Sequence, residues 1–429
     1  MLDLNVIRRD PELVRESVAR RGLDPARADV DRFLELDARR RDIQTRRDGL
    51  KHEQTELGNR IRLVSADQKA ALVEQVRALK SQVVALDQEH TTVERDWRTA
   101  WAVLPNLLGV GVPSGHDESQ NVEVSRWGEP PTLDFAPRDH VELGRLTDTI
   151  DFERAAKVTG ASFYYLKREA ALLEQALLAY AAGRLVAEGF VPMSTPDLAR
   201  DEVLEGIGFQ PRGPETQIYS IEGTDLSLIG TAEITLGGYH RDEILEGDDL
   251  PLRYLGFSQC FRTEAGTYGR ESRGLYRVHQ FTKAEMFVIC RPEDSQSWHE
   301  RMRELEEELF RGLGLAYRVV NVCSGDLGAP AAKKYDIEAW MPGRGSFGEV
   351  TSCSNCTDYQ ARRLGIRFRS GQGGKVQHPH MLNGTAIAVS RTLIALMESY
   401  QREDGSITVP EVLRPLMHGI SQIPRRLPE

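Results

Sequence analysis

Two heptad seams in the first hundred residues constrain the fold of this chain more than any other feature. In the first, apolar or long side chains recur at steps of three and four residues from Phe33 to Val64. In the second, the same steps run from Leu72 to Trp97. Such spacing places these side chains along one stripe of a helix, as in a coiled coil. We therefore predict two long helices, at about residues 31–64 and 68–102.

The connection between these helices is very short. Only residues 65–67 separate the two runs, and Ser65 and Asp67 are good N-cap residues for the second helix. A parallel arrangement would need a connection long enough to run back along the first helix. Because this connection is too short for that, the helices must pack antiparallel. With a rise of about 1.5 Å per residue, each helix would be about 50 Å long. We therefore expect residues 1–103 to form an all-α domain that carries a long antiparallel two-helix coiled-coil arm.

The arm differs in charge from the rest of the chain. The whole chain has 55 Lys and Arg against 65 Asp and Glu, a net charge of −10, which excludes a basic footprint over the entire molecule. Residues 31–64 nevertheless hold nine basic and seven acidic side chains. Their arginines either form the solvated face of a coiled coil or contact the phosphates of a nucleic acid. The candidates for phosphate contact are Arg39, Arg40, Arg46, Arg47 and Arg60.

The rest of the chain divides into a linker and a larger mixed domain. Residues 104–140 interleave five prolines with four glycines, which is typical of a linker. From residue 141 to 429, helix-like and strand-like patterns follow one another without regular alternation, which predicts an α+β domain with a mostly antiparallel sheet. The helix candidates are 169–188, 295–312 and 386–400. The strand candidates are 254–261, 281–290, 315–323, 335–341 and 347–353.

Cysteine usage indicates a reducing compartment. The chain has five cysteines, and only Cys353 and Cys356 lie close together in the sequence. This is not a disulfide framework, and without a second such pair we expect no structural zinc there. The N-terminus lacks the basic start and apolar run of a signal peptide, and no stretch approaches the ~18 apolar residues of a membrane helix. We therefore expect a cytoplasmic protein with no membrane partner.

An arginine-rich loop, residues 262–277, lies between two of the strand candidates. Arginine matches phosphate because a guanidinium group can donate two parallel hydrogen bonds, and glycines let the backbone come close to a ligand. Composition alone favours equally a grip on a polyphosphate and a mobile surface hairpin with a charged tip. The residues concerned are Arg262, Glu264, Gly266, Gly269, Arg270, Glu271, Arg273, Gly274 and Arg277.

The spacing within this loop resembles motif 2 of the class II aminoacyl-tRNA synthetases. The matching segments are RTE at 262–264 and RVHQF at 277–281. With Lys283 and Glu285 following, the second segment is similar to the seryl-tRNA synthetase family in particular. His279 within it is expected to be structural or to position substrate, since adenylate formation needs no acid or base.

Other segments resemble the same family, so that the resemblance covers essentially the whole chain. They are GF at 189–190 with Pro192 and Pro196, TAE at 231–233, EVTSCSNC at 349–356, and NGT at 383–385 followed by Arg391. In the family, the first belongs to motif 1 and the dimer interface, and the second binds serine. The third binds metal and phosphate, the fourth is motif 3, and the long N-terminal hairpin is the tRNA-binding arm.

The resemblance implies a fold and a reaction. The fold is a class II synthetase catalytic domain over residues 141–429, with an antiparallel β-sheet and flanking helices. The reaction, in a homodimer, activates L-serine with ATP to seryl-adenylate and pyrophosphate. Serine then passes to the 3′-terminal adenosine of tRNA(Ser), with tRNA(Sec) as a further candidate. The protein must mainly position the reactants and stabilise charge.

For ATP, the resemblance assigns catalytic roles to two arginines. Arg262 would hold the α-phosphate and the serine carboxylate, and Arg391 would hold the γ-phosphate. Phe281 would stack on the adenine, while Glu349 and Ser352 are oxygen ligands of the kind that Mg²⁺ prefers. The ATP-binding candidates are Arg262, Thr263, Glu264, Val278, Phe281, Glu349, Val350, Thr351, Ser352 and Arg391.

Serine is small, so its recognition must be polar. Its ammonium group needs carboxylate or hydroxyl partners, and its hydroxyl needs both a donor and an acceptor. A site built this way rejects alanine, because its own polar groups would be left unpaired. The serine-binding candidates are Thr231, Ala232, Glu233, Arg262, Glu285, Asn383 and Thr385.

Two alternatives from the same family stay open at this point. A paralogue could bind tRNA without catalysis, although every charged residue of the three motifs is present. A paralogue could also be dedicated to a biosynthetic pathway or to antibiotic resistance. In the commoner bacterial pattern of the family, Ser390 and either Ala386 or Ile387 are often glycine, so the residues around motif 3 are bulkier here.

Overall fold

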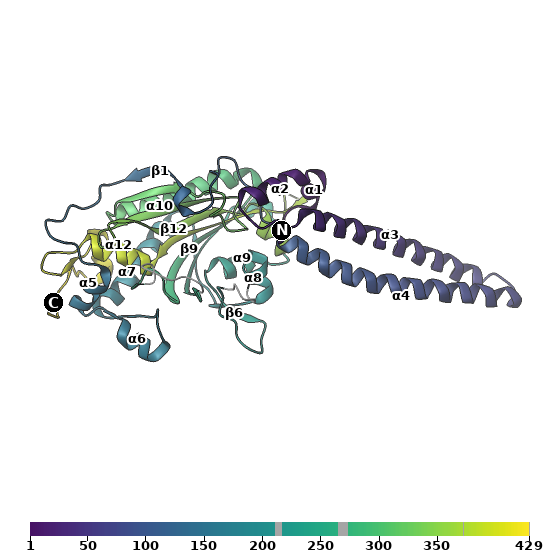
Figure 1. The fold of residues 1–429 in the computed structure, drawn as a ribbon, viewed down its shortest axis with the longest axis horizontal. Helices are drawn as coiled ribbons and strands as arrows, with labels where there is room; N and C mark the ends of the chain where they lie inside the picture. Colours follow the sequence, from purple (N-terminus) through teal and green to yellow (C-terminus); the bar gives the residue numbers. More distant parts are fainter. Residues whose placement is uncertain (211–216, 265–272, 372, 429) are drawn as a thin grey trace. The chain divides into compact units, whose positions relative to one another are not determined.

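The arm forms as the heptad seams predict. In the computed structural model, α3 (Val30–Ile61) and α4 (Ala66–Ala102) lie side by side and antiparallel (Figure 1). The structure describes residues 1–210, 217–264, 273–371 and 373–428. These form two compact units, Met1–Leu107 and Leu108–Glu429. The first unit also contains the short helices α1 (Leu4–Arg9) and α2 (Pro11–Arg20).

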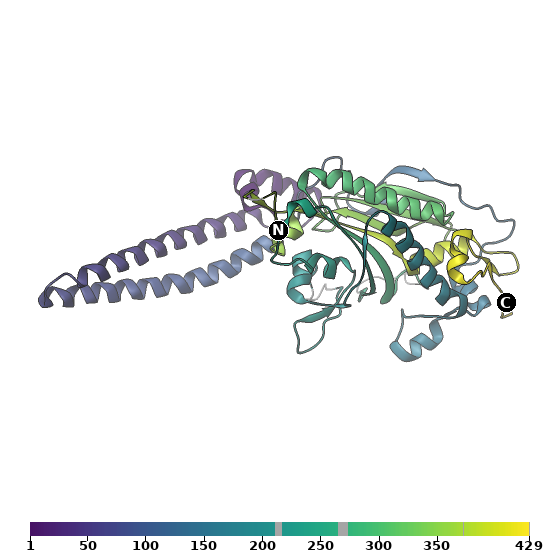
Figure 2. The same ribbon diagram turned by 180° about the vertical axis from the view of Figure 1, so that it is seen from behind.

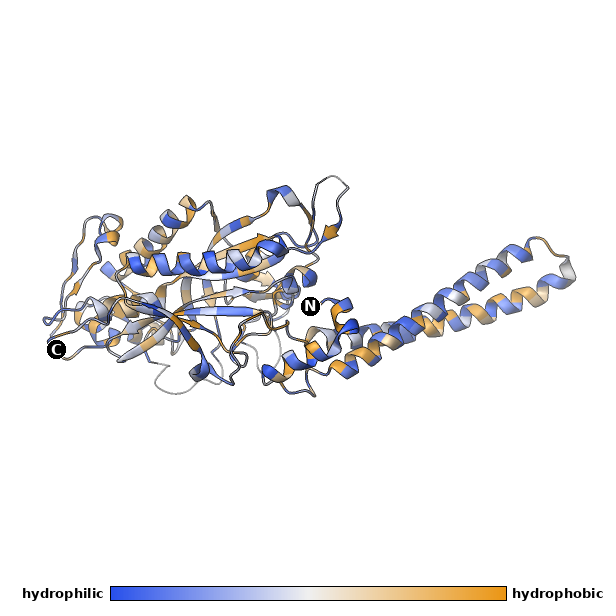
Figure 3. Cartoon of the chain, turned by 90° about the horizontal axis from the view of Figure 1, so that it is seen from above, coloured by the Kyte–Doolittle hydropathy of each residue, from blue (hydrophilic) through white to orange (hydrophobic). Residues whose placement is uncertain are grey.

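Aromatic seam residues gather at the end of the hairpin nearest α1. The ring centroids of Phe33 and Trp97 are 6.2 Å apart, and those of Trp97 and Trp101 are 4.9 Å apart. The guanidinium group of Arg40 lies 4.3 Å from the centroid of Trp97, so this polar seam position is packed. Figure 3 shows hydrophobic and hydrophilic residues interspersed along both helices. The buried aliphatic seam residues are Leu36, Ile43, Leu57, Leu79, Val83, Leu86 and Val93.

An eight-stranded sheet organises the second unit. All of its neighbouring strands are antiparallel except β4 and β8, which are parallel, so the predicted mostly antiparallel sheet is confirmed. In spatial order the strands are β1 (Val122–Trp127), β10 (Tyr317–Asn321), β11 (Lys333–Met341), β12 (Ser346–Asn355), β15 (His380–Ala388), β9 (Gln280–Cys290), β8 (Leu252–Phe261) and β4 (Val191–Ser194).

The five strand candidates are present, whereas β1, β4 and β15 of this sheet were not among the candidates. β1 comes from the segment that composition suggested to be a linker, yet it pairs with β10 over its whole length. All six of its residues are exposed, so it carries no alternation of buried and exposed side chains that the sequence could have shown.

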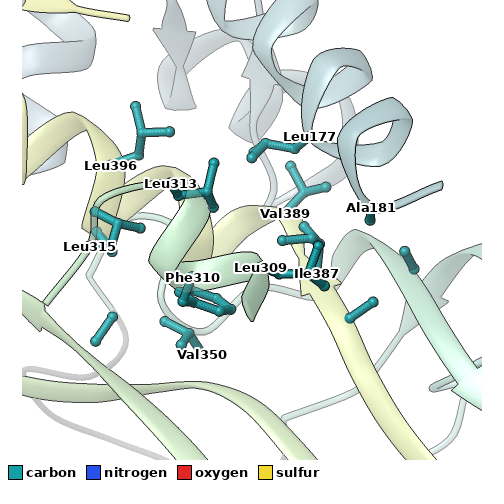
Figure 4. Packing of buried hydrophobic residues seen from close by; sticks show 14 of the residues in the cluster. Leu177, Ala181, Leu309, Phe310, Leu313, Leu315, Val350, Ile387, Val389 and Leu396 are labelled. Carbon is teal, nitrogen blue, oxygen red and sulfur yellow. The ribbon is translucent and has the colours of Figure 1, made fainter. Parts of the chain in front are cut away.

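Three helices pack against one face of the sheet: α7 (Arg168–Ala187), α10 (Ser295–Gly312) and α12 (Val389–Ser399). Figures 1 and 2 show α7 and α10 lying against the strands from the two viewing directions. Figure 4 shows part of the core between them, where Leu177 of α7, Phe310 of α10 and Val389 of α12 converge. The first three residues of the predicted helix 386–400 belong instead to β15.

The central strand β9 is buried on both faces. Its Met286 and Val288 belong to the core under these helices, whereas Phe287 and Ile289 belong to a second core on the other face. Because side chains alternate along a strand, the odd-numbered polar residues preceding Phe287 point to the second face as well.

Among the described residues, one helix, α7, is long and apolar enough to cross a membrane by length and composition alone, a test that the core helix of a soluble protein also passes. Leu173, Leu177 and Leu185 of this helix are completely buried in the core of the second unit. Its apolar composition is thus explained by packing against the sheet.

Shorter elements complete the second unit. The helices are α5 (His140–Thr147), α6 (Phe152–Thr159), α8 (Asp201–Ile207), α9 (Glu233–Gly238) and α11 (Tyr359–Arg363). The strands are β2 (Ile150–Asp151), β3 (Tyr165–Leu166), β5 (Leu198–Arg200), β6 (Leu226–Leu228), β7 (Ile244–Glu246), β13 (Arg367–Arg369), β14 (Val376–Gln377), β16 (Ile407–Thr408) and β17 (Gln422–Ile423). α8, α9 and α11 contribute to the second core, beside the site described below.

Candidate active site

A pocket of about 290 Å³ brings most of the predicted site residues together. It lies over the sheet face that carries the odd-numbered side chains of β9, and strands β12 and β15 form the rest of its floor. The predicted residues that line it are Thr231, Glu233, Arg262, Glu264, Val278, Phe281, Glu285, Glu349, Val350, Thr351, Ser352, Asn383, Thr385 and Arg391.

Ala232 and Thr263 are the exceptions, since neither is among the described residues that line the pocket. Ala232 is buried at the start of α9, and the backbone N–H of Thr263 donates to the carbonyl oxygen of Gln217 at 3.0 Å. Each is the middle residue of a three-residue segment whose two outer residues face the pocket. Sequence reasoning assigned the whole segments and could not separate their inward from their outward positions.

A buried polar cluster forms one end of the pocket. The ammonium nitrogen of Lys283 lies 2.5 Å from a carboxylate oxygen of Glu285 and 2.7 Å from the hydroxyl of Thr231. The hydroxyl of Thr385 donates to Glu285 at 3.3 Å. The negative charge of Glu285 is therefore already balanced by a neighbouring cation. Lys283 was not predicted as a contact residue, although its place in the motif was visible in the sequence.

Glu233 lies at the same end but has a different environment. It accepts hydrogen bonds from the side-chain amides of Gln360 at 2.7 Å and Asn383 at 2.8 Å, both of which are neutral. Burial, followed by repulsion from Glu285, raises the pKa of Glu233 from 4.5 to about 7. An ammonium group placed beside this carboxyl group would favour its ionised form. This end of the pocket is therefore suited to a small cation.

Arg262 is held from two sides at the centre of the pocket. Its Nε donates to the carbonyl oxygen of Gly230 at 3.3 Å, and its guanidinium group lies 5.3 Å from the ring centroid of Phe281. His279 Nδ1 lies 2.9 Å from the carbonyl oxygen of Arg262, and the N–H of Arg262 donates to the carbonyl of His279 at 3.0 Å. These contacts fit a structural role for His279.

Arg391, in the first turn of α12, lies at the other end with Tyr276. Its Nε donates to the carbonyl oxygen of Tyr276 at 3.3 Å, and its Nη1 lies 3.0 Å from a carboxylate oxygen of Glu349. The guanidinium carbons of Arg391 and Arg344 lie 4.6 and 4.0 Å from the ring centroid of Tyr276. Sequence reasoning missed Tyr276, whose only signal was its position beside Arg277.

The predicted metal ligands Glu349 and Ser352 lie on β12. Desolvation opposes ionisation of Glu349, but Arg391 and Lys334 outweigh it and lower the pKa of this carboxyl group. Carboxylate and hydroxyl oxygens on one side of a pocket are donors that suit Mg²⁺. Among the described residues, no group of three or more His, Cys, Asp or Glu could hold a metal ion, so ligand oxygens would have to complete its coordination.

The two neighbouring cysteines are buried in separate surroundings. The Cys353 thiol lies 3.9 Å from the carbonyl oxygen of His299, and the side-chain amide of Asn383 donates to the sulfur of Cys356 at 3.6 Å. Burial raises the pKa of the Cys353 thiol well above its usual range. The thiolate form, which metals bind, is therefore disfavoured at Cys353.

The arm arginines differ in how available they are. Arg40 and Arg47 are mostly covered, with 18% and 22% of their side chains exposed, and they pair across the hairpin with Glu94 and Asp87. Arg39 and Arg46 are 60% exposed, although each also has a carboxylate partner on the arm. Arg60 lies near the tip of the hairpin and is exposed.

Part of the predicted arginine-rich loop lies outside the described residues, namely Gly266, Gly269, Arg270 and Glu271. The described residues at its two ends form one ion pair within the loop and one with the residue before α5. Glu264 pairs with Arg277 at 2.9 Å, and Arg273 pairs with Asp139 at 2.9 Å.

Comparison with known proteins gives the same family for both units. Residues 1–108 match the family model for the seryl-tRNA synthetase N-terminal domain. Residues 218–400 match the model for the tRNA synthetase class II core domain (G, H, P, S and T). The serine--tRNA ligase of Dictyoglomus turgidum is 56% identical over 423 residues, 99% of each chain, and that of Rubrobacter xylanophilus is 53% identical, over 97% of each.

Solved structures are similar over the full length. The seryl-tRNA synthetase of Pyrococcus horikoshii complexed with ATP has a TM-score of 0.93 and 42% identity, covering 100% of both chains. The cytoplasmic serine-tRNA ligase of Naegleria fowleri in complex with AMP has a TM-score of 0.86 and 32% identity, covering 100% of this chain and 99% of the other. Similarity of this degree over nearly the whole of both chains leaves one assignment: the chain belongs to the seryl-tRNA synthetase family.

Proposed function

We propose that this chain is an ATP-dependent serine--tRNA ligase that first forms seryl-adenylate and then transfers serine to the 3′-terminal adenosine of tRNA(Ser). The observation that carries the proposal is the joint placement of Glu233 and Arg262 in one pocket. A carboxyl group that favours a bound ammonium group lies in the same pocket as a guanidinium group suited to phosphate and carboxylate oxygens.

The first step needs positioning and charge stabilisation. A serine carboxylate oxygen forms a bond to the α-phosphorus of ATP, and the bond from that phosphorus to the pyrophosphate oxygen breaks. Arg262 meets the charge on the α-phosphate, and Arg391 meets the charge on the leaving pyrophosphate. Both arginines are fixed by hydrogen bonds to backbone carbonyl oxygens, so little reorganisation is needed when ATP binds.

Serine would bind at the end of the pocket opposite to Arg391. Glu233 would pair with the ammonium group of serine. Glu285 would accept from the serine hydroxyl, and the hydroxyl of Thr385, which donates to Glu285 here, would turn to donate to it. Alanine would leave that pair without its hydroxyl partner. The adenine would lie on Phe281, with Glu264 accepting from its amino group.

We assign a bound Mg²⁺ to Glu349 and Ser352, together with phosphate oxygens of ATP. Such an ion supplies neutralisation of phosphate charge. Residues Arg391 and Lys334, which lower the pKa of Glu349, keep this carboxylate ionised and available as a ligand.

The proposed macromolecular partners are tRNA and a second copy of the chain. The arm would contact the phosphates of tRNA(Ser), with Arg39, Arg46 and Arg60 as its better exposed candidates and tRNA(Sec) as a second candidate substrate. The active form would be a cytoplasmic homodimer through motif 1, here α7 and β4.

Deletion of the arm tests the proposal, because it separates the two half-reactions. Removing residues 44–86 joins Ile43 to Asp87 by a short turn, about one helical turn from the level at which Arg47 pairs with Asp87 across the hairpin. We expect serine-dependent ATP–pyrophosphate exchange to stay within about twofold of the intact chain. Charging of tRNA(Ser) should fall at least about a hundredfold, because several phosphate contacts are lost.

A milder variant tests the arm contacts themselves. Arg46→Ala combined with Arg60→Ala should raise the KM for tRNA and reduce its salt dependence, with the serine and ATP constants unchanged. Arg77→Ala is a matched control, since Arg77 is an exposed arm arginine paired with Glu74 and is not a candidate contact. Absence of serine-dependent exchange in the intact chain would refute the ligase. Unchanged charging by the deletion variant would refute the role of the arm.

A further inference from the structure

Residues at the start of α5 contact the end of the arginine-rich loop that leads into β9. His140 is buried, and its Nε2 accepts a hydrogen bond from the backbone N–H of Leu275 at 3.1 Å. Its Nδ1 lies 2.8 Å from a carboxylate oxygen of Glu398, near the end of α12. Because a backbone N–H can only donate, Nε2 must be unprotonated, and Nδ1 therefore carries the proton that is donated to Glu398.

The preceding residue makes a second contact with the same end of the loop. One carboxylate oxygen of Asp139 caps α5 by accepting from the N–H of Glu142 at 2.9 Å. Its other oxygen pairs with Arg273 at 2.9 Å. Between the two contacts lies Gly274, with φ of +72°, where an added Cβ would come within 2.1 Å of His140 Nε2. Only glycine allows the backbone and the imidazole ring to approach so closely.

Glu398 connects this contact to both cations around Tyr276. One of its carboxylate oxygens accepts from the ring and the backbone N–H of His140, and the other accepts from the N–H of Gly343 at 2.9 Å. Gly343 directly precedes Arg344, whose guanidinium carbon lies 4.0 Å from the ring centroid of Tyr276. Glu398 also belongs to the helix whose first turn carries Arg391.

We propose that Asp139, His140 and Glu398 form a positioning clamp that fixes Leu275 and Tyr276 and thereby holds Arg391 ready for the phosphates of ATP. None of these three residues is among the described residues that line the pocket, and the clamp acts through the Tyr276 carbonyl oxygen that accepts from Arg391. It is separate from the serine end of the pocket, whose groups come from α9, β9 and β15. The assignment of ATP to this pocket rests on the proposed function.

Two substitutions of His140 separate the clamp from general stability. The amide of asparagine overlaps the Nδ1 edge of histidine, so His140→Asn can still donate to Glu398 but cannot reach Leu275. The longer glutamine places its carbonyl oxygen near the Nε2 position, so His140→Gln can still accept from Leu275. We expect His140→Asn to raise the KM for ATP about tenfold and His140→Gln to stay within about threefold of the intact chain. The KM for serine should change little in either.

Tyr400→Phe is the matched control, because it removes one hydrogen bond, from Tyr400 to the carbonyl oxygen of Leu313, at the same end of α12 without touching the loop. It should leave the KM for ATP unchanged. If His140→Asn does not fold, Asp139→Asn serves instead, since asparagine still caps α5 while losing the charge that pairs with Arg273. It should raise the KM for ATP about twofold.

Affinity for a non-hydrolysable ATP analogue, measured by calorimetry without serine, keeps this test independent of the proposed function. Weaker analogue binding by the asparagine variant than by the glutamine variant supports the clamp even if serine activation fails. Equal analogue affinity for the two variants, or equal loss of serine and ATP affinity, would overturn it.

Discussion

Replacing Glu233 by glutamine should change how serine activation depends on pH. The pKa of Glu233 is about 7, because the carboxyl group is buried and repelled by Glu285. The serine ammonium group pairs with the ionised carboxylate. As the pH falls below about 7, an increasing fraction of the free protein carries a protonated Glu233, and kcat/KM for serine should fall with it.

The size of the effect follows from the same shift. Raising a pKa from 4.5 to about 7 corresponds to about 3 kcal/mol of free energy needed to ionise the group. Well below pH 7, kcat/KM for serine should therefore fall about tenfold per pH unit. Glutamine keeps a carbonyl oxygen that accepts from Gln360 and Asn383, so the substitution removes the charge and little else. At pH 8 we expect Glu233→Gln to lower kcat/KM for serine 10- to 100-fold, because a hydrogen bond to a charged group contributes about 1.5–3 kcal/mol.

The assay is serine-dependent ATP–pyrophosphate exchange from pH 5.5 to 8.5 at limiting serine. The pH dependence of kcat/KM for ATP at saturating serine, measured in both proteins, is the control for ionisation of the nucleotide. Glu202→Gln is a control substitution, since Glu202 is an exposed carboxylate paired with Arg241. An acidic limb of equal slope in Glu233→Gln and in the unchanged protein would refute the assignment of that limb to Glu233.

Stability should respond with the opposite sign. Because the pKa of Glu233 is higher in the folded chain than in the unfolded chain, the folded state binds more protons between pH 4.5 and about 7. The contribution of this group to the free energy of unfolding therefore decreases as pH rises through that window. Glu233→Gln should be more stable than the unchanged protein at pH 8, and the difference should disappear at pH 4.5, as measured by urea unfolding.

Three further predictions concern the phosphate-binding arginines, the serine contact and a buried carboxyl group. Arg262→Ala and Arg391→Ala should each lower kcat for pyrophosphate exchange at least about a hundredfold, because each removes a cation from developing phosphate charge; near-normal exchange by Arg262→Ala would contradict the motif 2 assignment. Thr385→Val should raise the KM for serine about tenfold and weaken discrimination against alanine in exchange assays, whereas equal losses for serine and ATP would argue against a direct serine contact. Glu306→Gln should leave the free energy of unfolding at pH 7 within about 1 kcal/mol, because burial raises the pKa of Glu306 and glutamine still accepts from Thr351, whereas Glu306→Leu should cost about 1–3 kcal/mol in the same denaturation experiment.

Sequence patterns of short range predicted the arm and most of the sheet. The 3,4 spacing from Phe33 onward fixes which side of each helix is apolar, and the three-residue break forces the antiparallel hairpin. Each of these signals depends on residues that are close together in the sequence, so no tertiary information is needed to interpret it. β1 had no such signal, because an edge strand with six exposed residues is held by backbone hydrogen bonds to β10 rather than by buried side chains.

The chemistry of the site was visible in the sequence only as residue types in ordered segments. The segments containing Arg262, Glu285 and Thr385 named the groups that could bind ATP and serine. They did not show that Lys283 pairs with Glu285 whereas Glu233 accepts from the amides of Gln360 and Asn383. Those two amides come from elements far from Glu233 in the chain.

The sequence by itself therefore determined the local elements, the family resemblance and the inventory of charged groups. The tertiary structure alone decided which of those groups share a pocket, that the pKa of Glu233 is raised, and that two guanidinium groups lie near the ring of Tyr276. The reason is physical: helix and strand periodicity is written in neighbouring residues, whereas burial, pairing and pKa depend on distances that exist only once β9, β12, β15 and α12 have come together.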